Sequence, residues 1–229
     1  MAGTAFLGGA FDPVHRGHLR LAHAVKERLN LESVEFIPNA APPHKHGSHL
    51  PYETRVALLK LALENEPYLH VNTLERDNSH PHYTYETLRL LREEKGPDTP
   101  LFFVIGLDSL LALDTWYHGL ELTSLAHLVV LGRPGYSLDD ASETMRAYLK
   151  DRLIFSHEAD FDKALATPAG HCLYVEGEAE DVSSSELRAR ILNYYASKDS
   201  AALDYLHTHL PEEVCATILS SHLYANDLL

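Results

Sequence analysis

The chain is poor in cysteine and in long apolar runs. Its 229 residues include two cysteines, Cys172 and Cys215, and no CxxC pair, which argues against a disulfide framework or a cysteine zinc site. No apolar run approaches the roughly 20 residues that span a bilayer, and LFFVIGLDSLL is broken by Asp108. The N-terminus lacks a basic region followed by a signal-like apolar core. We therefore expect no membrane association and a cytoplasmic location.

Positive charge is also scarce. Nineteen Lys and Arg stand against 33 Asp and Glu, which gives a formal net charge of −14. A nucleic-acid-binding protein needs a positive face for the phosphate backbone, so no nucleic-acid partner is expected. Any phosphate that the chain binds must be held by a local group of cations and backbone N–H groups.

Short apolar runs alternate with longer helical patterns along the whole chain. This alternation predicts an α/β fold, a doubly wound Rossmann-like parallel sheet with helices on both faces. Residues 1–229 are expected to form a single domain, with 183–229 as its helical C-terminal part and 133–170 as an insertion at the sheet edge. Strands are predicted at 4–9, 34–38, 69–75, 101–106, 126–132 and 172–177, and helices at 17–29, through Arg55 and Leu63, and at 85–94, 184–196 and 211–223.

The loop after the first predicted strand has an unusual composition, GGAFDPVHRGHL. In open α/β sheets the ligand lies beyond the carboxyl ends of the strands, where this loop begins. Gly8 and Gly9 allow close approach of the backbone, and His15 and His18 fall near the start of a helix. Free N–H groups and a partial positive charge at a helix N-terminus, together with two imidazoles, predict a phosphate site.

This string resembles the [HT]-x-G-H signature of a nucleotidyltransferase superfamily, and VSSSELR at 182–188 resembles its second motif. PNAAPPHK, HYTYETL, GLDSLLALDTWYHGLEL and AHLVVLGRPGY lie between the two. In this order and spacing the segments resemble the bacterial nicotinate-nucleotide adenylyltransferases over nearly the whole chain. The resemblance implies transfer of AMP from ATP to nicotinate mononucleotide, with deamido-NAD and pyrophosphate as products. It also implies Mg²⁺ bound mainly through the ATP phosphates, and no protein metal site.

The resemblance also assigns roles to residues. The catalytic group is expected to be His15, His18, Lys45 and Arg188. ATP contacts are expected from Gly8, Gly9, His15, His18, Gly106, Asp108, Arg133, Ser183, Ser185 and Arg188. Nicotinate mononucleotide contacts are expected from Ala10, Phe11, Asn39, His44, Lys45, Thr84, Trp116 and Tyr117. Trp116 would stack on the pyridine ring, and backbone N–H groups beside Thr84 and Tyr117 would face the carboxylate.

Small departures from the family pattern concern affinity more than chemistry. Ala10 stands where threonine is usual, Ser185 where threonine is commoner, and Glu86 where the family often has aspartate or a neutral residue. None of the three removes a charged catalytic group. The loop at 39–50, dense in proline and histidine, is a candidate for closing over substrate.

Other interpretations stay open. The acceptor could be nicotinamide mononucleotide or another phosphorylated compound such as phosphopantetheine, or the chain could be a non-catalytic nucleotide-binding regulator. His15 and His18 have a spacing that also occurs in metal sites, but no cysteine ligands or HExxH helix accompany them. Taken singly, Trp116 is more typical of a core, Arg188 of a surface ion pair, and the serine run of a helix N-cap. A homo-oligomer is left open.

Overall fold

The fold is described from a computed structural model that covers residues 3–40, 50–76, 83–132, 135–178 and 182–225. The strands are β1 Thr4–Gly9, β2 Ser33–Pro38, β3 Leu69–Val71, β4 Leu101–Gly106, β5 His127–Gly132, β6 Leu153–Phe155 and β7 Cys172–Glu178. The α-helices are α1 Arg16–Arg28, α2 Tyr52–Ala62, α3 Thr84–Lys95, α4 Leu107–Leu111, α5 Glu143–Leu149, α6 Phe161–Ala164, α7 Ser184–Ser197, α8 Ser200–His209 and α9 Glu212–Ser220. Short 3-10 helices lie at Leu113–Thr115, Gly119–Ser124 and Leu138–Asp140.

Within the described residues the strands form one seven-stranded sheet in the order β3-β2-β1-β4-β5-β7-β6. Every neighbouring pair runs parallel. The chain moves outward through β2 and β3, returns to β4 beside β1, and then moves outward on the other side. This reversal between β1 and β4 is the switch point of a doubly wound fold, and the predicted fold class is confirmed.

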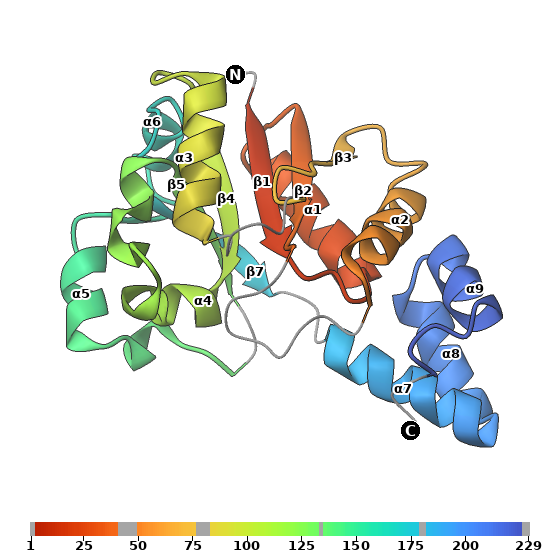
Figure 1. The fold of residues 1–229 in the computed structure, drawn as a ribbon. Helices are drawn as coiled ribbons and strands as arrows, with labels where there is room; N and C mark the ends of the chain where they lie inside the picture. Colours follow the sequence, from red (N-terminus) through yellow and green to blue (C-terminus); the bar gives the residue numbers. More distant parts are fainter. Residues whose placement is uncertain (1–2, 41–49, 77–82, 133–134, 179–181, 226–229) are drawn as a thin grey trace.

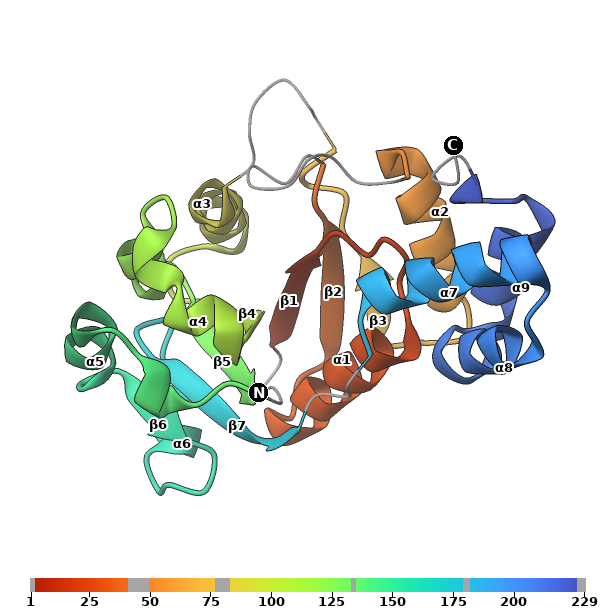
Figure 2. The same ribbon diagram turned by 90° about the horizontal axis from the view of Figure 1, so that it is seen from below.

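Helices cover both faces of the sheet because successive strand residues point to opposite faces. Ala5 and Leu7 of β1 join a buried cluster with residues of α1, α2, α6 and the C-terminal helices. Phe6, between them, joins a second buried cluster with residues of α3, α4 and α5. Figure 1 shows α3 and α4 in front of the sheet and α1 behind it, and Figure 2 shows the same layers from below.

The structure corrects some of the expected boundaries. The third strand ends at Val71 instead of residue 75, and α9 ends at Ser220 instead of residue 223. Residues 200–209, which were not predicted as an element, form helix α8. The expected edge insertion at 133–170 contributes α5, α6 and the edge strand β6, which pairs with β7. Six strands were predicted, and β6 was missed.

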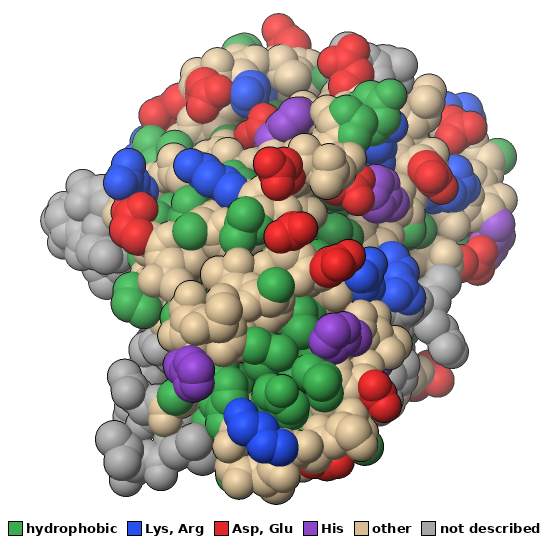
Figure 3. Space-filling view, turned by 90° about the vertical axis from the view of Figure 1, so that its right-hand side faces the viewer, with side chains coloured by type: hydrophobic (Ala, Val, Ile, Leu, Met, Phe, Trp, Pro, Cys, Tyr) green, Lys and Arg blue, Asp and Glu red, His purple; other side chains and the backbone are tan. Residues whose placement is uncertain are grey.

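The C-terminal helices α7–α9 form a layer beside α1 and α2, far from them in sequence (Figures 1 and 2). Figure 3 views the molecule from this side. Acidic and basic side chains are interspersed over the face, and apolar side chains gather in its lower half. No helix of the described residues is long and apolar enough to cross a membrane.

Candidate active site

The sheet opens at its carboxyl edge between β1 and β4. Pairing of these two strands ends at Leu7 and Val104. Pairing of β1 with β2 continues to Gly9, and pairing of β4 with β5 continues to Gly106. The last residues of β1 and β4 therefore diverge at the switch point, where ligands of open α/β sheets bind. The predicted ATP contacts Gly8, Gly9 and Gly106 lie at this opening.

Gly106, at the end of β4, leaves room for the side chain of Asp108. It is the N-cap of α4, and a Cβ at this position would collide with Oδ1 of Asp108. The lack of a side chain at Gly106 thus allows the Asp108 carboxylate to lie against the strand end. The structure brings these two predicted ATP-binding residues together at the opening.

The two histidines of the first motif form a stacked pair at the start of α1. His15 is the N-cap and His18 lies in the first turn, with ring centroids 3.7 Å apart. The backbone N–H of His15 donates to Nδ1 of His18 at 3.3 Å. In a neutral imidazole one nitrogen accepts and the other carries the proton, so this contact leaves the proton of His18 on Nε2. Nε2 is then the nitrogen that can donate to a phosphate.

Burial keeps both imidazoles neutral in the free protein. Burial, with a smaller contribution from His209, lowers the pKa of His15 to about 4. Burial and the neighbouring His15 lower the pKa of His18 well below its usual value. Removal from water disfavours the charged form of an imidazole, and the two rings disfavour each other's charge. Without phosphates present, the pair therefore offers hydrogen-bond donors instead of positive charge.

The second motif begins α7 and gives each serine a different contact. Ser183 is the N-cap, and its hydroxyl oxygen accepts from the backbone N–H of Glu186 at 3.1 Å. Ser184 donates to the carbonyl of Pro13 at 3.0 Å, in the first motif. Ser185 accepts from Nη2 of Arg188 at 3.2 Å. The cap interpretation of Ser183 is confirmed, and its contact to a triphosphate stays a prediction.

A glycine brings the two motifs into contact. A Cβ on Gly17, in the first turn of α1, would lie 2.7 Å from Cγ1 of Val182 and 3.0 Å from Nδ1 of His15. Contacts this short force a shift of the neighbouring side chain, so the absence of a side chain at Gly17 allows this packing. The starts of α1 and α7 consequently lie side by side, and both helices present free N–H groups at the same end of the sheet.

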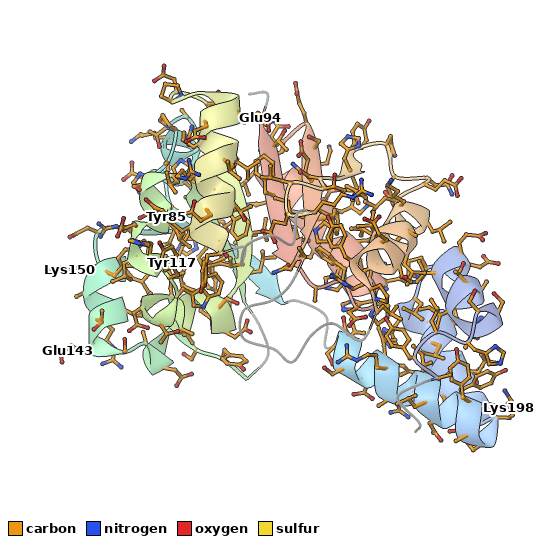
Figure 4. The ribbon with its side chains drawn as sticks, viewed as in Figure 1. Tyr85, Glu94, Tyr117, Glu143, Lys150 and Lys198 are labelled. Carbon is orange, nitrogen blue, oxygen red and sulfur yellow. The ribbon has the colours of Figure 1, made fainter. Side chains whose placement is uncertain are left out.

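The predicted nicotinate residues lie across the opening, on the α3 and α4 side. Thr84 is the first residue of α3, and Trp116 and Tyr117 follow the 3-10 helix Leu113–Thr115. Tyr117 is 47% exposed, and its ring centroid lies 4.6 Å from that of Tyr83 and 6.2 Å from that of Tyr85. Figure 4 shows Tyr85 and Tyr117 close together near α3. The structure thus places the Thr84 segment beside Tyr117.

The remaining described candidates lie on the first and second loops. Asn39 donates its backbone N–H to the carbonyl of Gly9, and its buried Oδ1 has no hydrogen-bond partner among the described residues. Phe11 is 2% exposed and packs against His18 and Phe36, so a ligand would meet its backbone and not its ring. Three predicted contacts, His44, Lys45 and Arg133, lie outside the described residues, as does most of the candidate closing loop.

Arg55 is a residue of the site that the sequence analysis missed. Its side chain is 1% exposed and donates to the carbonyls of Ala10 at 2.6 Å, Asn39 at 2.7 Å and Leu50 at 3.2 Å. One guanidinium therefore joins the loop after β1 to the segments that flank residues 41–49. The sequence did contain a signal for this role. Arg55 lies on the face of α2 that otherwise carries buried residues such as Leu59, and a buried arginine requires polar partners.

Two more residues, Asp12 and Tyr224, were also missed. Asp12 is 3% exposed, and its carbonyl accepts from Nη1 of Arg188 at 2.6 Å. Tyr224 comes near the end of the chain, and its hydroxyl donates to Oδ1 of Asp12 at 2.9 Å. Asp12 belongs to the recognised motif string, but no sequence pattern connects Tyr224 to this loop.

Comparison with known proteins gives a consistent family. The model of the cytidylyltransferase-like family matches residues 6–190. A protein of Sodalis glossinidius named "Probable nicotinate-nucleotide adenylyltransferase" is 40% identical over 189 residues, which are 82% of this chain and 85% of that protein. A protein of the same name from Shigella boydii is 36% identical over 220 residues, 96% of this chain and 97% of that protein. The chain belongs to the nicotinate-nucleotide adenylyltransferase family.

Solved structures agree with the fold of this nicotinate-nucleotide adenylyltransferase family member. The nicotinic acid mononucleotide adenylyltransferase of Plasmodium falciparum, solved in complex with NaAD, has a TM-score of 0.71. The match covers 98% of both chains at 15% sequence identity. At this identity the similarity establishes the shared Rossmann-like architecture, and the sequence relatives establish the family.

Proposed function

We propose that the protein transfers AMP from ATP to nicotinate mononucleotide, giving deamido-NAD and pyrophosphate. The observation that carries this proposal is the meeting of the two motifs, with His15 and His18 at the start of α1 and Arg188 in α7, at the opening between β1 and β4. The names of the relatives specify the acceptor. The product-bound Plasmodium falciparum structure supports the same reaction on this fold.

The reaction needs little help with proton transfer. A 5′-phosphate oxygen of nicotinate mononucleotide attacks the α-phosphorus of ATP and forms a new P–O bond. The bond from that phosphorus to the oxygen bridging the α- and β-phosphates breaks, and pyrophosphate leaves with the electron pair. The attacking phosphate is already ionised near neutral pH. Catalysis can therefore consist of positioning and of stabilising negative charge on the phosphoryl groups.

The described residues suit that task. The N-termini of α1 and α7 favour negative charge, and Arg188 supplies a planar fork for phosphate oxygens. Nε2 of His18 would donate a hydrogen bond to the α-phosphoryl oxygens, because Nδ1 is occupied by the N–H of His15. Donors fixed before the reaction lose no energy on reorganising as charge develops. Lys45 and His44 would add contacts from the second loop.

Magnesium is expected to enter with ATP. Mg²⁺ prefers oxygen ligands and is usually bound by substrate phosphates with one or two carboxylates. The metal would neutralise part of the triphosphate charge when bound. The described residues contain no group of three or more His, Cys, Asp and Glu that could hold a metal.

The carboxylate of nicotinate mononucleotide would be recognised near Thr84 and Tyr117. Trp116 and the tyrosines offer flat apolar surfaces for the pyridine ring. Backbone N–H groups beside Thr84 and Tyr117 would bind the carboxylate. A carboxylate accepts these hydrogen bonds more strongly than a carboxamide, because it is charged. With these contacts the site would favour nicotinate over nicotinamide mononucleotide.

The deciding experiment measures pyrophosphate release from ATP and Mg²⁺ with nicotinate mononucleotide, beside nicotinamide mononucleotide at equal concentration. We expect strong preference for the acid and deamido-NAD as product. Preference for the amide would keep the chemistry but contradict the pocket around Thr84 and Tyr117. No release with either compound or with other phosphorylated acceptors would favour a nucleotide-binding regulator. A cytoplasmic location and the assignment of 183–229 to the same domain stay predictions, and a homo-oligomer stays open.

A further inference from the structure

The C-terminal segment reaches the first motif through a buried hydrogen bond. Tyr224 lies after α9, and its hydroxyl donates to Oδ1 of Asp12 at 2.9 Å. The two residues are 4% and 3% exposed. Asp12 is followed after two residues by His15, so the end of the chain is bonded to the loop that carries the histidine pair. Hydrogen bonds to a charged carboxylate are about twice as strong as neutral ones.

Two features show that Tyr224 is held at this place. Its φ of +69° is in the left-handed region, which a bulky residue rarely adopts and keeps only when surrounding contacts enforce it. Burial and the adjacent Asp12 carboxylate raise the pKa of the phenol well above 10. The hydroxyl therefore keeps its proton throughout the working pH range and remains a donor to Asp12.

Asp12 also contacts Arg188 and so connects Tyr224 to it. The carbonyl of Asp12 accepts from Nη1 of Arg188 at 2.6 Å, while Nη2 donates to Oγ of Ser185 at 3.2 Å. Two points thus fix the plane of the guanidinium, and one of them is the backbone of Asp12. A shift of Asp12 would turn the guanidinium, whose use in phosphate binding depends on its orientation.

Other bonds join the same two parts of the molecule. Ser184 donates to the carbonyl of Pro13, and Nε of Arg16 donates to the carbonyl of Leu210, both at 3.0 Å. The start of α7 and the segment between α8 and α9 thus both contact the first motif. Unlike these two bonds, which end on backbone carbonyls, the bond from Tyr224 ends on a side chain, that of Asp12. The carbonyl of Asp12 is the group that Arg188 contacts.

We propose that Tyr224, acting through Asp12, is a positioning residue that orients Arg188 toward the ATP phosphates. The C-terminal segment then contributes to ATP binding, in addition to packing against the rest of the fold. The inference rests on the proposed function, because it takes ATP as the ligand of Arg188.

The test is the substitution Tyr224→Phe, which removes the hydroxyl and keeps the ring. Loss of one hydrogen bond to a charged group corresponds to roughly a tenfold change. We expect KM for ATP to rise by about tenfold, with KM for nicotinate mononucleotide changed by less than about twofold. The same weakening should appear in titration with a non-hydrolysable ATP analogue. The matched control is Tyr148→Phe, because the buried hydroxyl of Tyr148 is bonded to Oγ1 of Thr123 at 2.8 Å, in the other core cluster.

A double-substitution cycle separates positioning from general stability. If Tyr224 acts through Arg188, Tyr224→Phe should change ATP binding by less than about twofold in an Arg188→Lys background. Full additivity of the two effects, or an unchanged affinity for ATP in Tyr224→Phe, would overturn the inference. The inference would also be overturned if Tyr148→Phe lowered the affinity for ATP as much as Tyr224→Phe does. The analogue titration keeps this test independent of turnover, and a wild-type protein without turnover would count against the proposed function instead.

Discussion

The histidine pair at the start of α1 carries no charge in the free protein at neutral pH, since burial lowers the pKa of His15 to about 4. Among the described residues of the two motifs, positive potential therefore comes from the two helix N-termini and from Arg188. Since Nδ1 of His18 accepts from the N–H of His15, the neutral ring is the form that fits this arrangement.

Removing the imidazole of His18 tests its direct role. His18→Ala should lower kcat by roughly 10²–10³-fold, the scale for loss of one fixed donor to a developing charge. Pyrophosphate release at saturating substrates measures this change, and circular dichroism checks that the variant is folded. A loss of less than about threefold in a folded variant would mean that His18 does not contact the transition state.

Removing the indole of Trp116 tests the nicotinate pocket. Trp116→Ala should weaken the binding of nicotinate mononucleotide by roughly tenfold and leave ATP binding nearly unchanged, because loss of a stacking aromatic surface costs about 1 kcal/mol or more. Titration of each substrate separately measures both affinities. Equal weakening of the two substrates would contradict this assignment of Trp116.

Among the elements, α2 holds the loop after β1 against the described segments that flank residues 41–49. Its buried Arg55 donates to carbonyls on the loop after β1 and on the segments flanking 41–49. A lysine has no planar fork and cannot replace several such bonds from one position. The relative position of these described segments thus depends on a residue that is expected to touch neither substrate.

Arg55→Lys should therefore lower kcat/KM by roughly tenfold for both substrates and lower stability by about 1–3 kcal/mol, because buried carbonyls lose their donors. Steady-state kinetics and urea unfolding measure the two effects. Arg92→Lys is the matched control. Arg92 also donates to carbonyls, including those of Leu125 and Pro168, at the amino ends of the strands and away from the site. Similar kinetic losses in both variants would rule out a specific role for Arg55.

The sequence did not predict β6 and α8. β6 contributes only the partly exposed apolar residues Leu153–Phe155, a shorter run than those that marked β4 and β5. Helix α8 begins at an Asp199 cap, but only two of its residues, Ala202 and Leu206, are buried. Neither pattern separates its element clearly from a loop in the sequence alone.

Over the whole molecule, burial of histidines links stability to pH. His127 of β5 is fully buried, and its Nε2 lies 2.8 Å from the carbonyl of Thr167. Burial lowers its pKa from 6.5 to about 4. Between these values the unfolded chain binds a proton that the folded chain does not. Stability is therefore fully present above about pH 6.5 and is lost as pH falls toward 4. His15 contributes in the same direction.

For His127 alone this shift corresponds to about 3 kcal/mol across the whole range. Urea unfolding of the wild type between pH 7 and pH 4 should show this loss of stability, and His127→Gln should show a shallower slope. His70→Gln, which changes an exposed histidine on β3, should keep the wild-type slope. If His127→Gln keeps the wild-type slope, His127 does not contribute to the pH dependence.

The sequence determined the parallel sheet, the positions of its main strands along the chain and the two motif loops. These features follow from local rules, because continuous apolar runs make buried strands and each loop follows its strand directly. It also predicted that Gly106 and Asp108 lie together, because they are only two positions apart in the chain. The roles assigned to these residues came from the resemblance to the nicotinate-nucleotide adenylyltransferase family, whose members match most of the chain.

Only the tertiary structure decided which distant residues share the site. Arg55, Asp12 and Tyr224 meet because α2 and the C-terminal segment pack against the first loop, and no periodicity connects positions separated by as many as 212 residues. The neutral state of the histidine pair is likewise decided by burial, which a sequence motif does not encode. Local patterns fix the type of each element, whereas packing fixes which side chains lose water and which partners they find there.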